Sequence, residues 1–576
     1  MRPTDGFKAL ALAAVVAVPV LADDKRPDPP SPAATGPDSV QNVVFLGEHR
    51  PIFLRLRMSL GPQPFRVAWL DSVRAMHKFL DRNGDGTVSK AEADKDALAT
   101  LVRVANGGAT AMPRGDLDVR PKDGVVSVDE LTDALRTALG PFRVQAGKLA
   151  SGKTDALFDR LDRDNDGKLA HDELVDAAAT LHKFDLDEDE LIDGAELEPF
   201  TNPSAMQTEN MPGQRGRATE GPPVVELSPD DSSLRPVRQF LKKYDKGTGT
   251  AGSAGDNKLS LGEFAIDPKA FAKADADADG ALDTEELRRF LAKSAPDIEL
   301  AVTLSADASG AATITVAGGG SQSLPPWAKV KTLGPGDVEI AADEVRLEVH
   351  ADDGAAALVD ARRTYTNQFK AADTDNNGYV EKSEVTKDKN HPSPLAGLFD
   401  LLDRDADGKL YPKELDEFVD RQAEAARNRL VLTASDQGRA IFSILDLNRD
   451  RRLGNREIGG TTARMTTWDR NNDGRITADE IPHHYQLTLG RGRLAAVGTP
   501  DLGAVPGMNP EAIEPVASGP SWFRRMDRNH DGDVSRREFR GPKAQFDRLD
   551  ADRDGLLDAT EAATATASAA PKPPGK

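Results

Sequence analysis

The sequence predicts a mainly α fold: six tandem helix–loop–helix pairs with a small β insert. Three observations carry this prediction. A twelve-residue acidic pattern recurs along most of the chain. Apolar side chains precede each copy at helical spacing, and the copies follow one another at two regular intervals.

The first copy, DRNGDGTVSKAE from Asp81 to Glu92, shows the pattern. Oxygen-bearing side chains stand at its first, third and fifth places, and a glutamate stands at its twelfth. Gly86 takes the sixth place, where a sharp turn needs a positive φ, and Val88 takes the apolar eighth place. The pattern therefore predicts a tight loop whose alternate residues point at one centre.

Ten copies keep this pattern, and two further copies are damaged. Numbered first to twelfth with the damaged second and fifth included, the intact loops offer side chains at places one, three, five and twelve and a backbone carbonyl at place seven. The predicted metal ligands are Asp81, Asn83, Asp85, Thr87 and Glu92; Asp162, Asp164, Asp166, Lys168 and Glu173; Asp185, Asp187, Asp189, Leu191 and Glu196; Asp275, Asp277, Asp279, Ala281 and Glu286; Asp373, Asp375, Asn377, Tyr379 and Glu384; Asp403, Asp405, Asp407, Lys409 and Glu414; Asp446, Asn448, Asp450, Arg452 and Glu457; Asp469, Asn471, Asp473, Arg475 and Glu480; Asp527, Asn529, Asp531, Asp533 and Glu538; and Asp550, Asp552, Asp554, Leu556 and Glu561.

This donor set suits Ca²⁺, which takes six to eight hard oxygen ligands and accepts both oxygens of one carboxylate. Mg²⁺ demands a smaller octahedral cage and uses such a set less well. The second loop lacks early ligands, because Val119 and Pro121 stand in their places. An insertion separates Asp245 from the rest of the fifth loop. We expect weak or no metal binding at these two loops.

The residues around the loops predict helices that enter them. Phenylalanine stands four residues before the first ligand in seven loops, at Phe158, Phe271, Phe369, Phe399, Phe442, Phe523 and Phe546. An apolar residue usually precedes the loop directly, which places both side chains on one helix face. The apolar eighth residues predict short strands that join paired loops.

The intervals between first ligands predict that neighbouring loops pair. They are 23 residues for Asp162 and Asp185, Asp446 and Asp469, and Asp527 and Asp550, and 30 residues for Asp245 and Asp275, and Asp373 and Asp403. The predicted segments are a signal peptide (1–22), a spacer with short strands (23–65), pair 1 (66–140), pair 2 (145–202), a linker (203–234), pair 3 (235–296), the β insert (297–352), pair 4 (356–425), pair 5 (426–490), a linker (491–520), pair 6 (521–565) and a disordered tail (566–576).

On these motifs the chain resembles the EF-hand calcium-binding superfamily, and more narrowly secreted bacterial proteins with several EF-hand pairs. The nearest structural rival is the dockerin module, which has similar loops in one duplicated pair. Two loops depart from the motif, because Glu190 and Arg451 replace the glycine of the sixth place. A side chain costs about 1 kcal/mol at positive φ. We therefore expect the fourth and ninth loops to bind calcium more weakly than the third and tenth.

Composition excludes several classes of function. The chain of 576 residues carries 74 basic and 95 acidic residues, a formal net charge of −21, and no cysteine. Nucleic-acid binding is not expected from so acidic a chain, and disulfides and thiolate metal sites are excluded. Much of the surplus acid stands in the loops, so calcium binding would leave the loaded protein nearly neutral.

The amino terminus predicts export. A short basic start precedes the apolar run from Ala9 to Ala22, which ends in small residues, as in a secretory signal peptide. An uncleaved anchor is the alternative. We expect a bacterial protein of the periplasm, cell surface or exterior, with no transmembrane span in the mature chain.

The predicted function is calcium binding with a structural or calcium-storing role. The alternatives are a calcium-dependent sensor, an adhesion or scaffold module that binds an unidentified protein partner, and a non-catalytic subunit of an envelope enzyme. No enzyme is predicted, because no catalytic motif is found. The adjacent His483 and His484 are interpreted as surface residues rather than zinc ligands.

Overall fold

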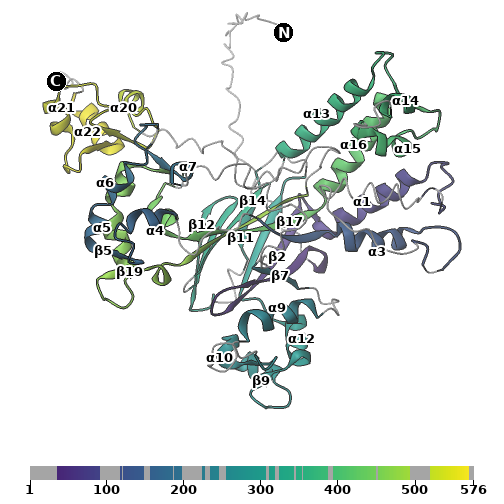
Figure 1. Cartoon of the computed structure of the whole chain (residues 1–576), viewed down its shortest axis with the longest axis horizontal. Coiled ribbons are helices and arrows are strands. Elements are labelled where there is room, and N and C mark those ends of the chain that lie inside the picture. The colour runs from purple at the N-terminus through teal and green to yellow at the C-terminus, as the bar shows by residue number, and fades with distance from the viewer. Residues whose placement is uncertain are drawn as a thin grey trace, which may run out of the picture. The chain divides into compact units, whose positions relative to one another are not determined.

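Two six-stranded β-sheets share one hydrophobic core in the computed structural model of the chain (Figure 1). Helices make up 39% of the structure and strands 27%, so the fold is mixed α/β and the prediction of a mainly α fold is wrong. The structure describes residues 36–90, 92, 117–119, 121–147, 156–185, 187–197, 223–227, 234–245, 255–306, 311–317, 324–342, 345–352, 355–386, 393–448, 450, 452–492 and 519–569.

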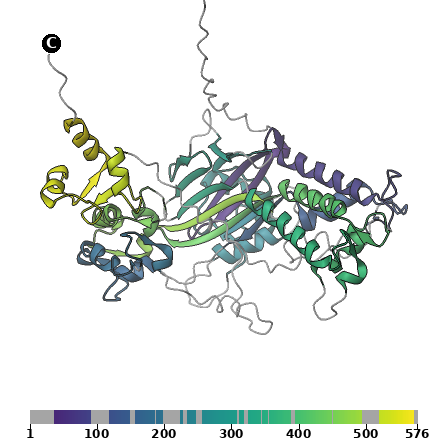
Figure 2. The ribbon, with the colours of Figure 1, turned by 90° about the horizontal axis from the view of Figure 1, so that it is seen from above.

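The first sheet has the strand order β11-β10-β2-β1-β7, with β3 paired to β2, and the second has the order β12-β13-β14-β20-β17-β4. Figure 2 shows these strands from above. The strands of the first sheet are β1 (Val40–Leu46), β2 (Pro51–Leu60), β3 (Gln63–Pro64), β7 (Val224–Leu227), β10 (Ile298–Leu304) and β11 (Thr313–Val316). Those of the second are β4 (Phe142–Ala146), β12 (Ala328–Gly334), β13 (Asp337–Ala342), β14 (Val345–Asp352), β17 (Leu430–Arg439) and β20 (His483–Arg491).

The predicted β insert is therefore not a separate unit. Its five strands, β10 to β14, are divided between both sheets, and two of them pair with strands from distant parts of the chain: β10 with β2 and β14 with β20. In β10 and β14, buried residues alternate with half-buried ones, which is the pattern of a strand with one face in a core. Strands from the predicted spacer (β1 and β2), the first linker (β7) and pair 5 (β17 and β20) complete the sheets.

Three strand pairs are parallel: β2 with β10, β14 with β20, and β4 with β17. A parallel pair needs a long crossover between its strands, and all the described α-helical segments except the C-terminal one, which follows β20, lie within these crossovers. Their helices are α1 (Phe65–Leu80) and α3 (Val128–Leu139) before β4; α4 (Ala156–Leu161), α5 (His171–Val175), α6 (Ala177–Leu181) and α7 (Gly194–Leu197) before β7; α9 (Arg235–Tyr244), α10 (Leu261–Phe264), α11 (Pro268–Ala274) and α12 (Thr284–Lys293) before β10; α13 (Ala355–Ala372), α14 (Lys382–Val385), α15 (Phe399–Leu402) and α16 (Pro412–Arg427) before β17; α17 (Ile441–Leu445), α18 (Asn455–Gly459) and α19 (Thr461–Met465) before β20; and α20 (Ser521–Met526), α21 (Lys543–Leu549) and α22 (Ala559–Ala569) after it.

Short antiparallel strands join the loops in twos, and they contain the apolar eighth residues. Four such pairs join neighbouring loops: β8 (Leu259–Ser260) with β9 (Ala281–Leu282), β15 (Val380–Glu381) with β16 (Lys409–Leu410), β21 (Asp533–Ser535) with β22 (Leu556–Asp558), and the bridge of Ser89 with Val125.

The other two pairs join loops that are far apart in sequence. β5 (Lys168–Ala170) of the third loop pairs with β19 (Arg475–Thr477) of the tenth, and β6 (Ile192–Asp193) of the fourth pairs with β18 (Arg452–Leu453) of the ninth. Residues 156–197 and 441–481 thus form one unit of four loops, here called the composite module, which Figure 1 shows as interleaved blue and green ribbons. The predicted tandem pairs 2 and 5 are wrong.

The chain between neighbouring loops explains this difference. After the third loop, α5 and α6 follow each other with Asp176 between them, so about ten helical residues hold the third and fourth loops roughly 15 Å apart. After the eleventh loop, Gly541 and Pro542 interrupt the chain before α21 begins. The chain turns back there, and the eleventh and twelfth loops meet although their interval is also 23 residues.

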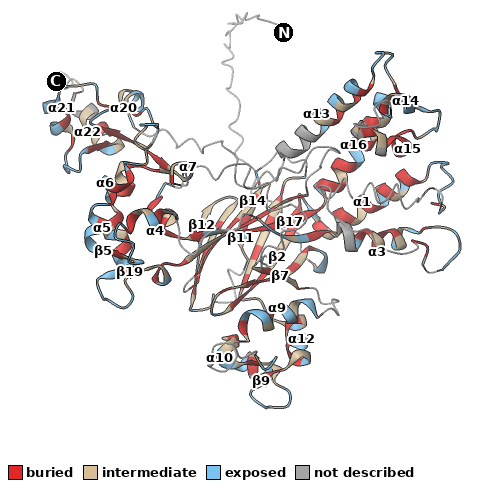
Figure 3. Cartoon of the chain, in the orientation of Figure 1, coloured by how far each residue is buried: buried red, intermediate tan, exposed pale blue. Residues whose placement is uncertain are grey.

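Hydrophobic cores join the segments further, as the buried residues of Figure 3 show. Pairs 1 and 4 share one core in which Trp69, Tyr365 and Phe418 are buried. Pair 3 packs Phe240 and Phe264 against Val44 and Phe53 of the first sheet. The C-terminal pair, residues 519–569, has a smaller core of its own.

The predicted signal peptide lies outside the described residues, as does most of the second linker. Helix α22 continues to Ala569, so the predicted tail is partly helical. Among the described residues, no helix has the length and apolar character needed to span a membrane.

The pairing of β18 with β6 yields a prediction. Replacing the fully buried Leu453 with alanine should destabilise the composite module by about 2–5 kcal/mol, because it leaves a cavity. Hydrogen exchange measured by mass spectrometry should show lost protection in residues 187–197, which are distant in sequence. The matched variant Leu557→Ala in the C-terminal pair should leave that segment protected. Lost protection confined to residues 441–481 would contradict the composite module.

Candidate calcium sites

A common set of backbone hydrogen bonds shapes each intact loop. In eight loops, Oδ2 of the first aspartate accepts a bond of 2.9–3.2 Å from the backbone N–H of the sixth residue. In all ten, Oε2 of the twelfth glutamate accepts one of 2.8–3.1 Å from the ninth residue. The ligand side chains of the first and twelfth places thereby hold the backbone of the first and second halves of the loop in place.

Carboxylates of the first, third and twelfth places converge. In the third, fourth, sixth, seventh and eighth loops, the three carboxylates offer ligand oxygens that lie within 4.8 Å of one another. The groups are Asp162, Asp164 and Glu173; Asp185, Asp187 and Glu196; Asp275, Asp277 and Glu286; Asp373, Asp375 and Glu384; and Asp403, Asp405 and Glu414.

The first aspartate supplies a test of whether a cation fits. Oδ1 of this residue is buried without a hydrogen-bond partner in four loops, at Asp275, Asp403, Asp527 and Asp550. A buried carboxylate oxygen without a partner is costly, and a bound cation would satisfy it. Since the neighbouring donors are all hard oxygens, the residues fit Ca²⁺.

Two places take the left-handed conformation in the nine intact loops whose fourth and sixth residues the structure describes, whereas the sequence predicted only the sixth. At the sixth place φ is positive at eight glycines and also at Glu190, where it is 68°. The fourth place does the same, at Gly84, Asn165, Glu188, Ala278, Asn376, Ala406, Asn472, His530 and Arg553. The recurrence of asparagine at the fourth place was a signal that sequence reasoning overlooked. Arg451 lies outside the described residues.

Side chains at the seventh place are less free than the sequence suggested. Arg475 of the tenth loop reaches across the short sheet to Oδ2 of Asp166 in the third loop, over 2.7 Å. Lys258 of the fifth loop bonds Asp279 of the sixth in the same way. A positively charged side chain of one loop therefore contacts a predicted ligand of the paired loop. This interaction could not be predicted without knowing which loops pair.

The two damaged loops keep part of the shared geometry. In the second, Gly124 donates to Oδ2 of Asp118 over 3.0 Å, so Asp118 substitutes for the missing first ligand one residue early. Nζ of Lys90 lies 3.0 Å from the same oxygen and neutralises it. In the fifth, Asn257 donates to Asp245 over 2.8 Å across the insertion. Weak or absent calcium binding at these loops stays a prediction.

The eleventh loop has the most perturbed carboxylate. Burial raises the pKa of Asp531 to about 7, against the opposing backbone hydrogen bond from Asp533. The adjacent Gly454 and Leu191 belong to the composite module, and Oδ2 of Asp531 lies 3.4 Å from the position that a Cβ on Gly454 would occupy. Packing between the two units thus desolvates this ligand.

Neither His483 nor His484 is a simple surface residue. Both lie on β20, partly buried, with side-chain exposures of 17% and 12%. His483 bonds Asp436 over 2.5 Å, and His484 lies 3.3 Å from Glu348. Consecutive strand residues point to opposite faces, so the two imidazoles do not share one site.

Comparison with known families agrees with this geometry. A model of an EF-hand domain pair matches residues 122–180, and a model of a single EF hand matches residues 78–92, 266–291, 366–387, 521–541 and 543–561. No curated protein and no solved structure matches the chain. The chain therefore contains EF-hand domains of the EF-hand superfamily, and these domains imply calcium binding.

The matched pair at residues 122–180 covers the second and third loops, which are neighbours in sequence. In the structure these loops belong to different units, because the second pairs with the first and the third with the tenth. The family match thus identifies the loops but not their partners.

The positive φ of Glu190 yields a second prediction. Replacing Glu190 with glycine should tighten calcium binding at the fourth loop roughly fivefold, since it removes about 1 kcal/mol of backbone strain. The mirror variant Gly167→Glu should weaken the third loop; no atom lies within 4 Å of the added Cβ, so strain alone is tested. Hydrogen exchange of residues 185–196 and 162–173 against buffered free calcium measures both. An unchanged midpoint in both variants would refute the argument.

Asp531 yields a third prediction. Calcium requires the ionised carboxylate, so it must displace a proton wherever the pH lies below about 7. The calcium midpoint of residues 527–538 should rise roughly eightfold between pH 7.5 and pH 6.0, in inverse proportion to the ionised fraction of Asp531. Asp531→Asn should bind more weakly but lose this extra dependence. An equal pH response in both proteins would show that Asp531 does not titrate there.

Proposed function

We propose that this is an exported, non-enzymatic protein in which calcium stabilises EF-hand modules arranged on a β-sandwich. The observation that carries the proposal is the composite module. Its loops join segments on either side of β14 and β17, with Arg475 and Asp166 in contact across 309 positions of sequence. Ions in such loops would hold together strands that the chain itself connects only by long crossovers.

The hydrophobic faces of the modules favour a structural role over a sensor. A sensor EF-hand exposes an apolar groove for its partner when calcium binds. Here the buried faces of pairs 1 and 4 pack against each other, those of the composite module enclose one core, and pair 3 packs on the first sheet. Those grooves are filled from within the chain, so opening them would cost the shared core.

Calcium storage is the second candidate, because ten intact loops offer many sites of similar chemistry. The two roles differ in what calcium does to stability. A structural ion is linked to folding, whereas a store needs only capacity. An exported location is part of the proposal, supported by the apolar run and small residues of the amino-terminal sequence.

Calcium removal separates these roles. A site filled at ten times its Kd adds about 1.4 kcal/mol to the free energy of unfolding, and chelation also leaves clustered carboxylates to repel one another. EDTA should therefore lower the unfolding temperature by several degrees and expose residues 156–197 and 441–481 to protease. Magnesium should restore little of this stability, because it cannot use the bidentate glutamate as well.

The single variant Glu173→Gln tests the same idea at one site. It removes a buried bidentate ligand of the third loop and should lower protection of the paired tenth loop as well. Storage would be favoured if EDTA left the unfolding temperature unchanged although native mass spectrometry without EDTA showed bound calcium. The absence of bound calcium would contradict the proposed function altogether.

A further inference from the structure

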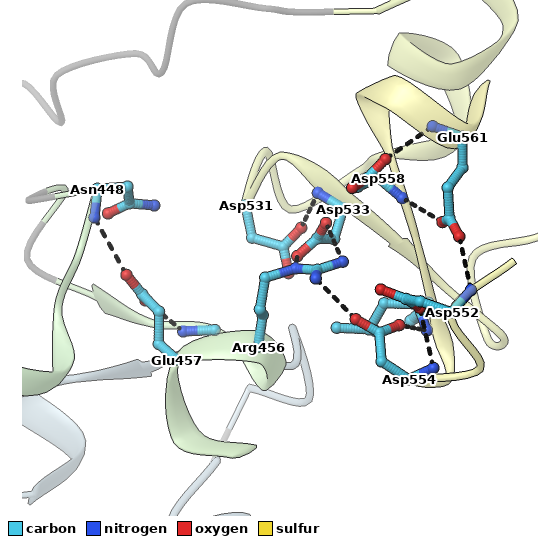
Figure 4. Close-up of polar contacts among 12 residues, drawn as sticks. Asn448, Arg456, Glu457, Asp531, Asp533, Asp552, Asp554, Asp558 and Glu561 are labelled. Carbon is cyan, nitrogen blue, oxygen red and sulfur yellow. Dashed lines mark hydrogen bonds and ion pairs between the residues drawn. The ribbon is translucent and has the colours of Figure 1, made fainter. Parts of the chain in front are cut away.

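The C-terminal pair contacts the composite module through a small polar interface, shown in Figure 4. The central residue of this interface is Arg456, in the first turn of α18 and at the eleventh place of the ninth loop. The guanidinium bonds Asp533 through two nitrogens, Nε at 2.8 Å and Nη2 at 3.0 Å. Its third nitrogen, Nη1, lies 2.7 Å from Oδ2 of Asp554.

Most contacts of this interface use atoms that calcium leaves free. Asp533 is the seventh residue of the eleventh loop, which gives calcium its backbone carbonyl rather than its side chain. Asn529 donates its Nδ2 to the carbonyl of Asp189 over 3.0 Å, and its Oδ1 still faces its own loop. Arg537 pairs with the non-ligand Glu188 over 3.1 Å. These contacts are compatible with filled loops.

The contact with Asp554 is different, because Asp554 is the fifth-place ligand of the twelfth loop. Its Oδ1 accepts a bond of 2.9 Å from the backbone of Leu556, and its Oδ2 is held by Arg456. An incoming ion that uses Oδ2 must share it with the guanidinium or displace the guanidinium. An ion that uses Oδ1 still lies close to Arg456, and two like charges at this distance repel each other.

Arg456 is held firmly enough to compete. Its fork-like contact with Asp533 is the strong, bidentate kind, and the side chain of Asp533 is only 11% exposed. A guanidinium stays protonated at every physiological pH, so its positive charge is permanent. The guanidinium of Arg456 therefore remains beside the twelfth loop even when Asp554 binds calcium instead.

We propose that Arg456 of the composite module is an internal competitor for calcium at the twelfth loop, so that the calcium affinity of the C-terminal pair depends on its contact with another part of the chain. The coupling is reciprocal, since calcium at the twelfth loop must weaken the hold of Arg456 to the same degree. This inference rests on the proposed calcium binding by that loop.

The chain offers a matched second case. Arg475 holds Oδ2 of Asp166, the fifth-place ligand of the third loop, at 2.7 Å. Arg288 is a neutral control, because it pairs with Glu285, which is not a predicted ligand. The substitutions R456Q, R475Q and R288Q make the same chemical change. R456Q removes a positive charge from the twelfth loop, R475Q removes one from the third, and R288Q removes none from a predicted ligand.

The experiment follows hydrogen exchange of residues 550–561 and 162–173 in the full chain against buffered free calcium. R456Q should lower the calcium midpoint of residues 550–561 about threefold or more and leave residues 162–173 unchanged. R475Q should do the reverse, and R288Q should move neither midpoint. R456K, which keeps the charge but loses the planar fork, should fall between the wild type and R456Q.

The outcomes separate the two proposals. A midpoint for residues 550–561 that is the same in R456Q and R288Q would overturn the competition while leaving calcium binding intact. If residues 550–561 respond to calcium in neither the wild type nor R456Q, or respond equally in E561Q, which lacks a ligand, the inference fails for lack of a site. If no loop in the wild type responded, the proposed function itself would fail.

Discussion

The backbone pairing of one loop with another is the interaction on which the rest of the structure depends. Two or three residues from each loop form the strands, with the buried eighth residue at their centre, as Ile476 and Leu169 do. This small sheet places two groups of carboxylates back to back and sets the entering helices around one core. Whether the partner loop is near or far in sequence decides how the chain is folded around it.

The β-sandwich and the modules constrain each other through this pairing. The strands β14 and β20 are parallel, and so are β4 and β17, so each pair needs a long crossover that returns the chain from one end of the sheet to the other. The EF-hand segments fill these crossovers, and the composite module joins two of them. A change in one loop is therefore expected to affect strands that are distant from it in sequence.

The carboxylates of the loops attract protein cations from other parts of the chain as well as calcium. Each loop concentrates carboxylates that a cation must compensate, and in places the chain supplies its own cation. Lys90 neutralises the damaged second loop, Arg475 contacts the third, and Arg456 contacts the twelfth. The second loop, which Lys90 neutralises, has lost its early ligands. The third and twelfth loops keep all their predicted ligands, and in each an arginine holds one carboxylate oxygen of the fifth-place ligand.

The loops, their apolar eighth residues and the positive φ at the sixth place could be predicted from the sequence alone, because all of these depend on residues within twelve positions of one another. The sequence did not determine the sandwich, since β10 and β14 alternate like any half-buried strand and their partners stand hundreds of residues away. Nor did the interval of 23 residues decide which loops pair. Only the tertiary structure decided that, because a continuous α5–α6 segment separates two loops where the Gly541–Pro542 break brings two together.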